Sequence, residues 1–194
     1  MIIRLIHGVL SDARIGLVEG SLSVKVYRTH AGNGSTTQYT NYPTTTAEFD
    51  RLFDTAYTNT TLSWQGSLNA TPAINFSNYT SLTSAGVTLA SGDYFSLMAE
   101  GTFIPQETGT YTFAINSDDG SDLFIGGNFV VSYYGGHGMT GPMTGTISLT
   151  AGTQYSFRAR MQEYGGGEGL TVTWARPSQG SSYTLQTTEL GTLL

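Results

Sequence analysis

The stretch from Thr108 to Val131 most constrains what this chain can fold into, because its apolar residues alternate with small or polar ones. That alternation has the period of a half-buried β-strand. A Gly126-Gly127 pair then predicts a hairpin turn into a further apolar run that ends at Val131. The alternating apolar residues are Tyr111, Phe113, Ile115, Leu123 and Ile125. We therefore expect antiparallel strands on both sides of a polar turn.

Two adjacent aspartates, Asp118 and Asp119, occupy that polar turn. Consecutive strand residues point to opposite faces, so both carboxylates reach one ion only if the backbone departs from a regular strand. Repulsion between the two carboxylates favours a divalent cation. The alternative is an ordinary Asp-Asp-Gly turn, in which a carboxylate accepts hydrogen bonds from nearby amides.

The composition favours a single all-β domain. The chain has 194 residues, few charged residues (11%) and many aromatic ones (12%), with abundant threonine, serine and glycine. Its formal net charge of −6 disfavours nucleic-acid binding and favours divalent cations. Cysteine is absent, which excludes disulfides and thiolate metal sites. No apolar run reaches the roughly 20 residues that a membrane-spanning helix needs, and the apolar start is too short for a signal peptide.

Other elements can be placed along the chain. Thr45 and Glu48 form a capping-box pattern, and apolar residues at helical spacing follow, so we expect one short helix here. Residues 1–10 suggest a strand that either joins the domain's own sheet or docks on a neighbouring subunit. Residues 178–194 are expected to form a polar tail. Further strands are expected at Leu22–Arg28, Asp93–Ile104, Ile147–Leu149, Gln154–Met161 and Leu170–Trp174.

Seven separated motifs, in order, make the chain similar to the PA14 domain family over residues 17–177. They are G-T-F-I-P at 101–105, T-G-T-Y-T-F at 108–113, S-D-D-G-S at 117–121, L-F-I-G-G at 123–127, His137, A-G-T-Q-Y at 151–155 and L-T-V-T-W at 170–174. The resemblance implies an all-β, PA14-type β-sandwich or barrel with one short helix. Residues 1–16 would be an N-terminal arm and residues 178–194 a C-terminal tail.

The resemblance also implies a calcium site. In sugar-binding members of the family the Asp-Asp peptide bond is cis and both carboxylates bind one Ca²⁺, which implies these roles for Asp118 and Asp119. The family's remaining ligands come from the loop that corresponds to residues 162–169, often with an asparagine. This chain has no asparagine there, so either main-chain oxygens suffice or a long polar side chain substitutes, the candidates being Gln162, Glu163 and Glu168. Glycines 165–167 would let backbone oxygens approach the ion.

In such lectins sugar hydroxyls complete the calcium shell, and aromatic rings stack on the sugar. The candidates for this rim are Tyr133, Tyr134, His137 and Tyr164, with Gly166 and Gly167 in the same loop as Tyr164. The alternative for these aromatic residues is packing within their own loops, and the family histidine is more often structural than a ligand.

The leading hypothesis is a calcium-dependent carbohydrate-binding module whose partners are glycans presenting hexose diols. Its expected location is an extracellular surface or a virion. The competing hypothesis is a structural component of a large assembly, such as a virion or a surface layer, that contacts neighbouring subunits through its termini. The chain carries no nucleophile-elbow, zinc-protease or thiol motif, and Glu163 and Glu168 on one loop make a poor glycosidase pair. We therefore do not expect an enzyme.

Overall fold

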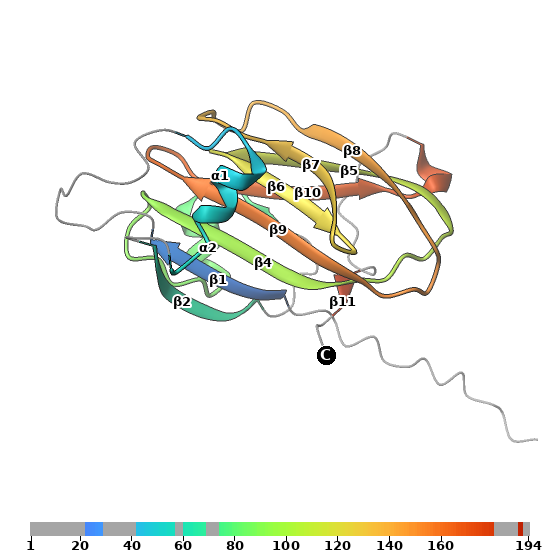
Figure 1. Ribbon diagram of the computed structural model, residues 1–194, viewed down its shortest axis with the longest axis horizontal. Helices are drawn as coiled ribbons and strands as arrows, with labels where there is room; N and C mark the ends of the chain where they lie inside the picture. The colour runs from blue at the N-terminus through green and yellow to red at the C-terminus, as the bar shows by residue number, and fades with distance from the viewer. Residues whose placement is uncertain (1–21, 29–41, 57–59, 69–73, 181–189, 192–194) are drawn as a thin grey trace, which may run out of the picture.

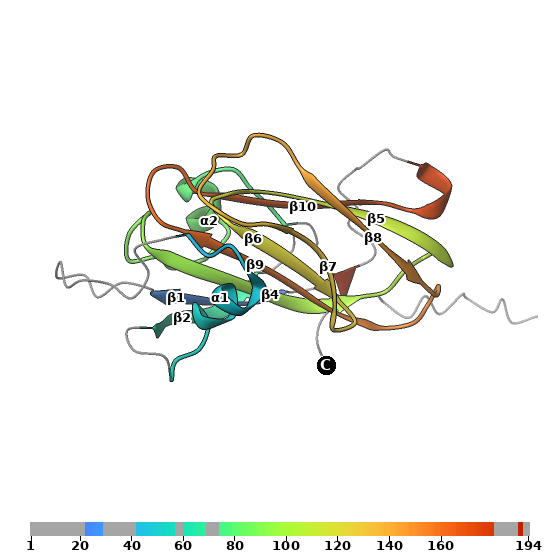
Figure 2. The ribbon, with the colours of Figure 1, turned by 45° about the horizontal axis from the view of Figure 1, so that its top comes forward.

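The computed structural model describes residues 22–28, 42–56, 60–68, 74–180 and 190–191. Two antiparallel sheets stack face to face (Figures 1 and 2), which confirms the predicted all-β sandwich. The N-terminal strand expected at residues 1–10 lies outside the described residues.

The larger sheet runs in the order β2-β1-β4-β9-β6-β7, with β11 also paired to β4. The smaller sheet runs β3-β10-β5-β8. The strands of the larger sheet are β1 (Leu22–Arg28), β2 (Thr61–Leu68), β4 (Phe95–Phe103), β6 (Ser121–Ile125), β7 (Asn128–Tyr133), β9 (Tyr155–Glu163) and β11 (Leu190–Gly191). Those of the smaller sheet are β3 (Asn75–Phe76), β5 (Gly109–Asp118), β8 (Met143–Leu149) and β10 (Gly169–Ala175).

The core lies between the two sheets and follows the alternation of the sequence. Phe113 on β5 and Trp174 on β10 are fully buried and lie 6.1 Å apart between ring centres. Phe103 on β4, in the opposite sheet, packs edge-on against both rings. The predicted inward faces of β1 and β4 are buried, including Leu22, Val24, Phe95 and Leu97. Burial of these side chains holds the two sheets together.

The predicted capping box starts helix α1 (Thr46–Arg51): the Thr45 hydroxyl accepts a hydrogen bond from the Glu48 N–H at 3.2 Å. The helix lies over the outer face of the larger sheet, in front of β4 and β9 (Figures 1 and 2), and buries Phe49. Beneath it the Arg160 guanidinium lies 5.2 Å from the centre of the Phe49 ring.

The prediction of a single helix was wrong, because a second helix, α2 (Tyr79–Ser84), follows β3. Asn78 and Ser81 form a reciprocal capping box at its start, and Leu82 is buried in the core. A helix of only six residues leaves little periodic signal, and the surrounding residues are mostly serine, threonine and asparagine. A 3-10 turn, η1 (Pro177–Gln179), follows β10. None of the helices in the described ranges is both long and apolar enough to cross a membrane.

Part of the C-terminal segment pairs with the larger sheet. In this pairing Leu190 lies opposite Phe103 and Gly191 opposite Thr102. The segment predicted as a polar tail therefore contributes the short strand β11 to the larger sheet.

Candidate functional site

A group of carboxylates lies where the ends of three strands meet at one end of the sandwich. Asp118 ends β5, Asp119 follows it, Glu163 ends β9 and Gly169 begins β10. Gly169 lies opposite Asp118 in the β5–β10 pairing. The antiparallel order of the sheets thus brings the turn after β5 and the loop after β9 together, although 45 residues separate Asp118 from Glu163.

The peptide bond between Asp118 and Asp119 is cis, as the family resemblance implied. One carboxylate oxygen from each of Asp118, Asp119 and Glu163 lies within 4.8 Å of the others. This acidic cluster, defined by these three residues, could hold a metal ion. Glu163 is therefore the loop carboxylate that joins the aspartate pair.

Asp119 is buried and held by both neighbouring loops. Its Oδ1 accepts a hydrogen bond from the His137 N–H at 3.0 Å, and its Oδ2 accepts one from the Tyr164 N–H at 3.0 Å. Its own N–H donates to the Gln162 carbonyl at 3.1 Å. Two backbone N–H groups therefore fix the position of this carboxylate, and the third contact fixes the backbone of Asp119.

Glu163 is fully buried, and neither of its carboxylate oxygens has a hydrogen-bond partner among the described residues. Burial raises its pKa to about 9, and the charges of Asp119 and Asp118 add to this shift. Burial also raises the pKa of Asp118, with Asp119 contributing, and it raises the pKa of Asp119 against the opposing effect of its two backbone hydrogen bonds. A cation bound between these carboxylates would supply positive charge that opposes the upward pKa shifts.

Glycine leaves room beside the Asp118 carboxylate. A methyl group placed on Gly167 would lie 2.8 Å from Asp118 Oδ2, and one on Gly138 would lie 3.8 Å from the same atom. Contacts below 3.0 Å force a displacement. Gly167 therefore keeps open the space around one of the three clustered carboxylates.

The other predicted loop residues surround the acidic cluster. Asp93 Oδ1 accepts a hydrogen bond from the Gly166 N–H at 3.1 Å and so holds the tip of the loop. Glu168 is buried, and burial raises its pKa, with Asp93 and Asp118 adding to the shift. Gln162 contributes its backbone carbonyl to Asp119, while its side-chain oxygen is buried without a partner among the described residues.

Three tyrosines border the cluster. The Tyr164 ring lies 5.2 Å from Tyr42 and 5.3 Å from Tyr94, measured between ring centres. Burial raises the pKa of Tyr42, and the charges of Asp119 and Glu163 add to the shift. The sequence analysis missed Tyr42 and Tyr94 because no spacing links either residue to the loop after β9.

The loop after β7 is held by contacts of the His137 and Tyr133 side chains. The two rings stack with centres 3.4 Å apart. The imidazole Nδ1 lies 3.1 Å from the Ser117 carbonyl oxygen, and Nε2 lies 3.1 Å from that of Tyr133. These contacts occupy both ring nitrogens, and the backbone N–H of His137 is the group that reaches Asp119.

Tyr134 belongs to a different group of side chains. Its hydroxyl donates to Asp122 Oδ2 at 2.9 Å, and its ring packs on Phe49 of α1. Arg160 also binds Asp122, with Nε at 2.8 Å from Oδ1. Tyr134 thus joins a buried ionic cluster beneath α1 rather than the tyrosines beside the acidic cluster.

Comparison with known proteins places the chain in a family. The PA14 domain model matches residues 32–187, whereas the sequence motifs alone gave 17–177. A comparison with curated protein sequences gives no match.

Solved structures share the fold at low sequence identity. A PA14 sugar-binding domain from an RTX adhesin is 20% identical, with a TM-score of 0.61, and the alignment covers 89% of this chain and 98% of that one. The epithelial adhesin 6 A domain from Candida glabrata, in complex with Galb1-3GlcNAc, is 16% identical, with a TM-score of 0.65 and coverages of 91% and 88%.

An anti-sigma factor domain-containing protein is 18% identical, with a TM-score of 0.56. The alignment covers 89% of this chain but only 48% of that protein, so this chain spans about half of its length. The family model covers most of the chain, and the two-sheet architecture agrees with it, so this chain belongs to the PA14 domain family.

Proposed function

We propose that this protein is a calcium-dependent carbohydrate-binding module. The observation that carries the proposal is the acidic cluster of Asp118, Asp119 and Glu163, in which the fully buried Glu163 carboxylate has no partner among the described residues. A buried, unpaired carboxylate is costly, and binding a cation removes that cost.

The residues present fit calcium. Calcium takes oxygen ligands, both carboxylate and carbonyl, and tolerates irregular geometry. The cluster offers carboxylate oxygens alone, with no thiolate or imidazole among its three members. A bound Ca²⁺ would supply positive charge and coordination positions that sugar hydroxyls can fill.

The protein's own residues would prepare the site before any ligand binds. Asp119 is held by the N–H groups of His137 and Tyr164, so its carboxylate needs little rearrangement. Gly167 keeps the approach to Asp118 open. Tyr42, Tyr94 and Tyr164 offer aromatic surface beside the cluster, on which the apolar face of a sugar ring could stack.

The relatives support glycans as the class of partner. One solved relative is described as a sugar-binding domain from an adhesin, and another was solved with the disaccharide Galb1-3GlcNAc. We extend this to a non-enzymatic role in attachment to glycans at a cell or virion surface. The similarity to these structures shows the shared fold, and the acidic cluster provides the argument for a shared role.

Calorimetric titration of the metal-free protein with CaCl₂, followed by titration with Galb1-3GlcNAc with and without calcium, tests the proposal. We expect saturable calcium binding and sugar binding that depends on it. Asp118→Asn is the informative variant, because it weakens a metal ligand without removing the acceptor that Asp119 provides to two loops. Calcium binding that is absent in the wild type, or unchanged in Asp118→Asn, would refute the metal site. Sugar binding that persists without calcium would refute the calcium dependence.

A further inference from the structure

A pocket of about 310 Å³ lies on the outer face of the larger sheet, away from the acidic cluster. It is lined by Glu100 and Gly101 of β4, Phe124 and Gly127 at the β6–β7 hairpin, and Ser156, Phe157 and Arg158 of β9. Ser156 and Glu163 are near opposite ends of β9, and seven residues of strand span roughly 23 Å. The pocket is therefore a separate site.

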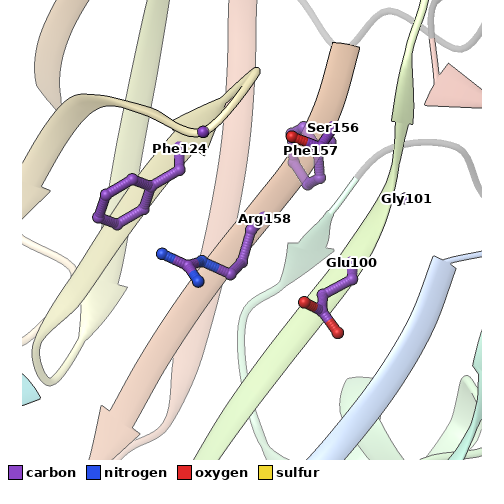
Figure 3. A pocket seen from close by; sticks show the side chains of 7 residues that line it. Glu100, Gly101, Phe124, Ser156, Phe157 and Arg158 are labelled. Atoms are coloured by element: carbon purple, nitrogen blue, oxygen red, sulfur yellow. The ribbon is translucent and has the colours of Figure 1, made fainter. Parts of the chain in front are cut away.

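Arg158 is the principal polar group of this pocket. Its Nε is buried and has no hydrogen-bond partner among the described residues. Its guanidinium carbon lies 4.4 Å from the centre of the Phe124 ring, so the ring supports one face of the guanidinium. Figure 3 shows Arg158 between Phe124 and Glu100, on three neighbouring strands.

The nearest cross-strand carboxylate does not neutralise Arg158. Glu100 lies opposite Arg158 in the β4–β9 register, but the ion pair that it forms is with Lys25, at 3.1 Å. Within the described part of the chain Arg158 has no ion pair. The Lys25 ammonium, outside the pocket lining, offsets the charge of the Glu100 carboxylate. The Arg158 guanidinium is therefore the charge of the lining that no ion pair among the described residues neutralises.

We propose that this pocket binds a sugar acid, meaning a small carboxylate ligand that also carries hydroxyl groups. The Arg158 fork suits a carboxylate, because its N–H donors match the two carboxylate oxygens. Glu100 can only accept hydrogen bonds when ionised, and Ser156 can donate or accept, so hydroxyl groups suit the rest of the lining. A volume near the lower end of the range for ligand pockets favours one small molecule.

Two-dimensional NMR of the ¹⁵N-labelled protein with D-glucuronate as the probe and D-glucose as its neutral counterpart tests the proposal. The buffer is passed over a chelating resin and contains no soluble chelator, since chelators carry carboxylates themselves. We expect saturable displacement of the Arg158 Nε–H signal by glucuronate and at least tenfold weaker binding of glucose. Equal affinity for the two sugars, or an unmoved Nε–H signal, would overturn the proposal.

Variants separate this pocket from the acidic cluster. Arg158→Gln should weaken glucuronate binding at least tenfold, and Arg158→Lys should fall between that variant and the wild type, because lysine keeps the charge but loses the fork. Arg51→Gln removes one positive charge from α1 and should bind as the wild type does. Asp118→Asn should also leave glucuronate binding intact, so failure of the calcium proposal would not affect this one. Unchanged glucuronate binding in Arg158→Gln would overturn the proposal of a sugar-acid pocket.

Discussion

The backbone N–H of Tyr164 donates a hydrogen bond of 3.0 Å to Oδ2 of Asp119. This bond ties the loop after β9 to the aspartate pair after β5. It places an aromatic side chain and a candidate metal ligand in fixed relation, because the residue before Tyr164 is Glu163. The loop after β9 therefore helps to fix both the acidic cluster and the Tyr164 ring beside it.

Removing the Asp119 side chain should destabilise the protein even without calcium. Asp119→Ala leaves the N–H groups of His137 and Tyr164 without their acceptor, at a cost of about 1–3 kcal/mol for an unsatisfied group. Asp118→Ala removes a carboxylate of raised pKa, and we expect it to cost less. Urea unfolding of both variants in metal-free buffer measures the difference. Equal losses would show that the two backbone contacts contribute little.

The metal-free protein should lose stability as the pH rises from about 5 to 9. The pKa of Glu163 is about 9 in the folded state and close to 4.5 in the unfolded state. Between these values the folded state holds a proton that the unfolded state has released, so the free energy of unfolding falls with rising pH. Asp118 and Asp119 also have raised pKa values, so they act in the same direction at the acidic end of this range.

Thermal unfolding at about pH 5 and pH 8 measures this trend. Glu163→Gln keeps the shape of the side chain and cannot titrate, so its melting temperature should depend less on pH. A difference of about 1 kcal/mol would shift the midpoint by roughly 2–4 °C for a domain of this size. The same pH dependence in the variant and the wild type would mean that another group causes it.

Gly167→Ala should weaken calcium binding more than it weakens the fold. The added methyl group would lie 2.8 Å from Asp118 Oδ2, so the carboxylate must move. Gly165→Ala is the matched control, because its methyl group would lie 3.9 Å from the nearest side-chain atom, Asp93 Oδ1. Calcium titration should show at least a tenfold loss for Gly167→Ala and little change for Gly165→Ala. Similar affinities in both variants would contradict the steric argument.

Replacing Tyr164 by alanine should weaken sugar binding and spare calcium binding. Loss of one aromatic contact costs about 0.5–1.5 kcal/mol beyond the buried area, or roughly 2- to 13-fold in affinity. The Tyr164 N–H that binds Asp119 remains in the variant. Phe129→Ala removes an exposed aromatic side chain from β7 and serves as the control. If both variants bind Galb1-3GlcNAc equally, the tyrosine rim does not contact the sugar.

The Arg160 cluster should be among the most sensitive parts of the fold. Arg160 and Asp122 are both buried and form two hydrogen bonds, so Arg160→Ala leaves a buried carboxylate without its cationic partner. Breaking such a pair costs about 3–5 kcal/mol. Asp50, whose side chain is 57% exposed, is the second partner, and Asp50→Asn should cost less than about 1 kcal/mol. Chemical unfolding of the two variants compares these costs directly.

Local features of the sequence predicted most of the framework. Alternation of apolar residues predicted β1, β4 and β5, the family resemblance gave β10, and the capping pattern at Thr45 predicted α1. The same reasoning missed α2, because a helix of six residues, four of them serine or threonine, has too few turns to show a period. It also missed β2 and β3, which lie in the Asn/Ser/Thr-rich part of the chain.

The sequence by itself determined that the chain forms antiparallel strands with an apolar face and that Asp118 and Asp119 lie together in a turn. Both properties depend on neighbouring residues, since strand alternation and turn chemistry are local. Only the tertiary structure decided that the Glu163 carboxylate, rather than that of Glu168, lies with those of the aspartate pair. It also placed Tyr42 and Tyr94 against Tyr164, and Tyr134 beneath α1. These outcomes depend on which loops converge, and sheet order sets that convergence through contacts between residues far apart in the chain.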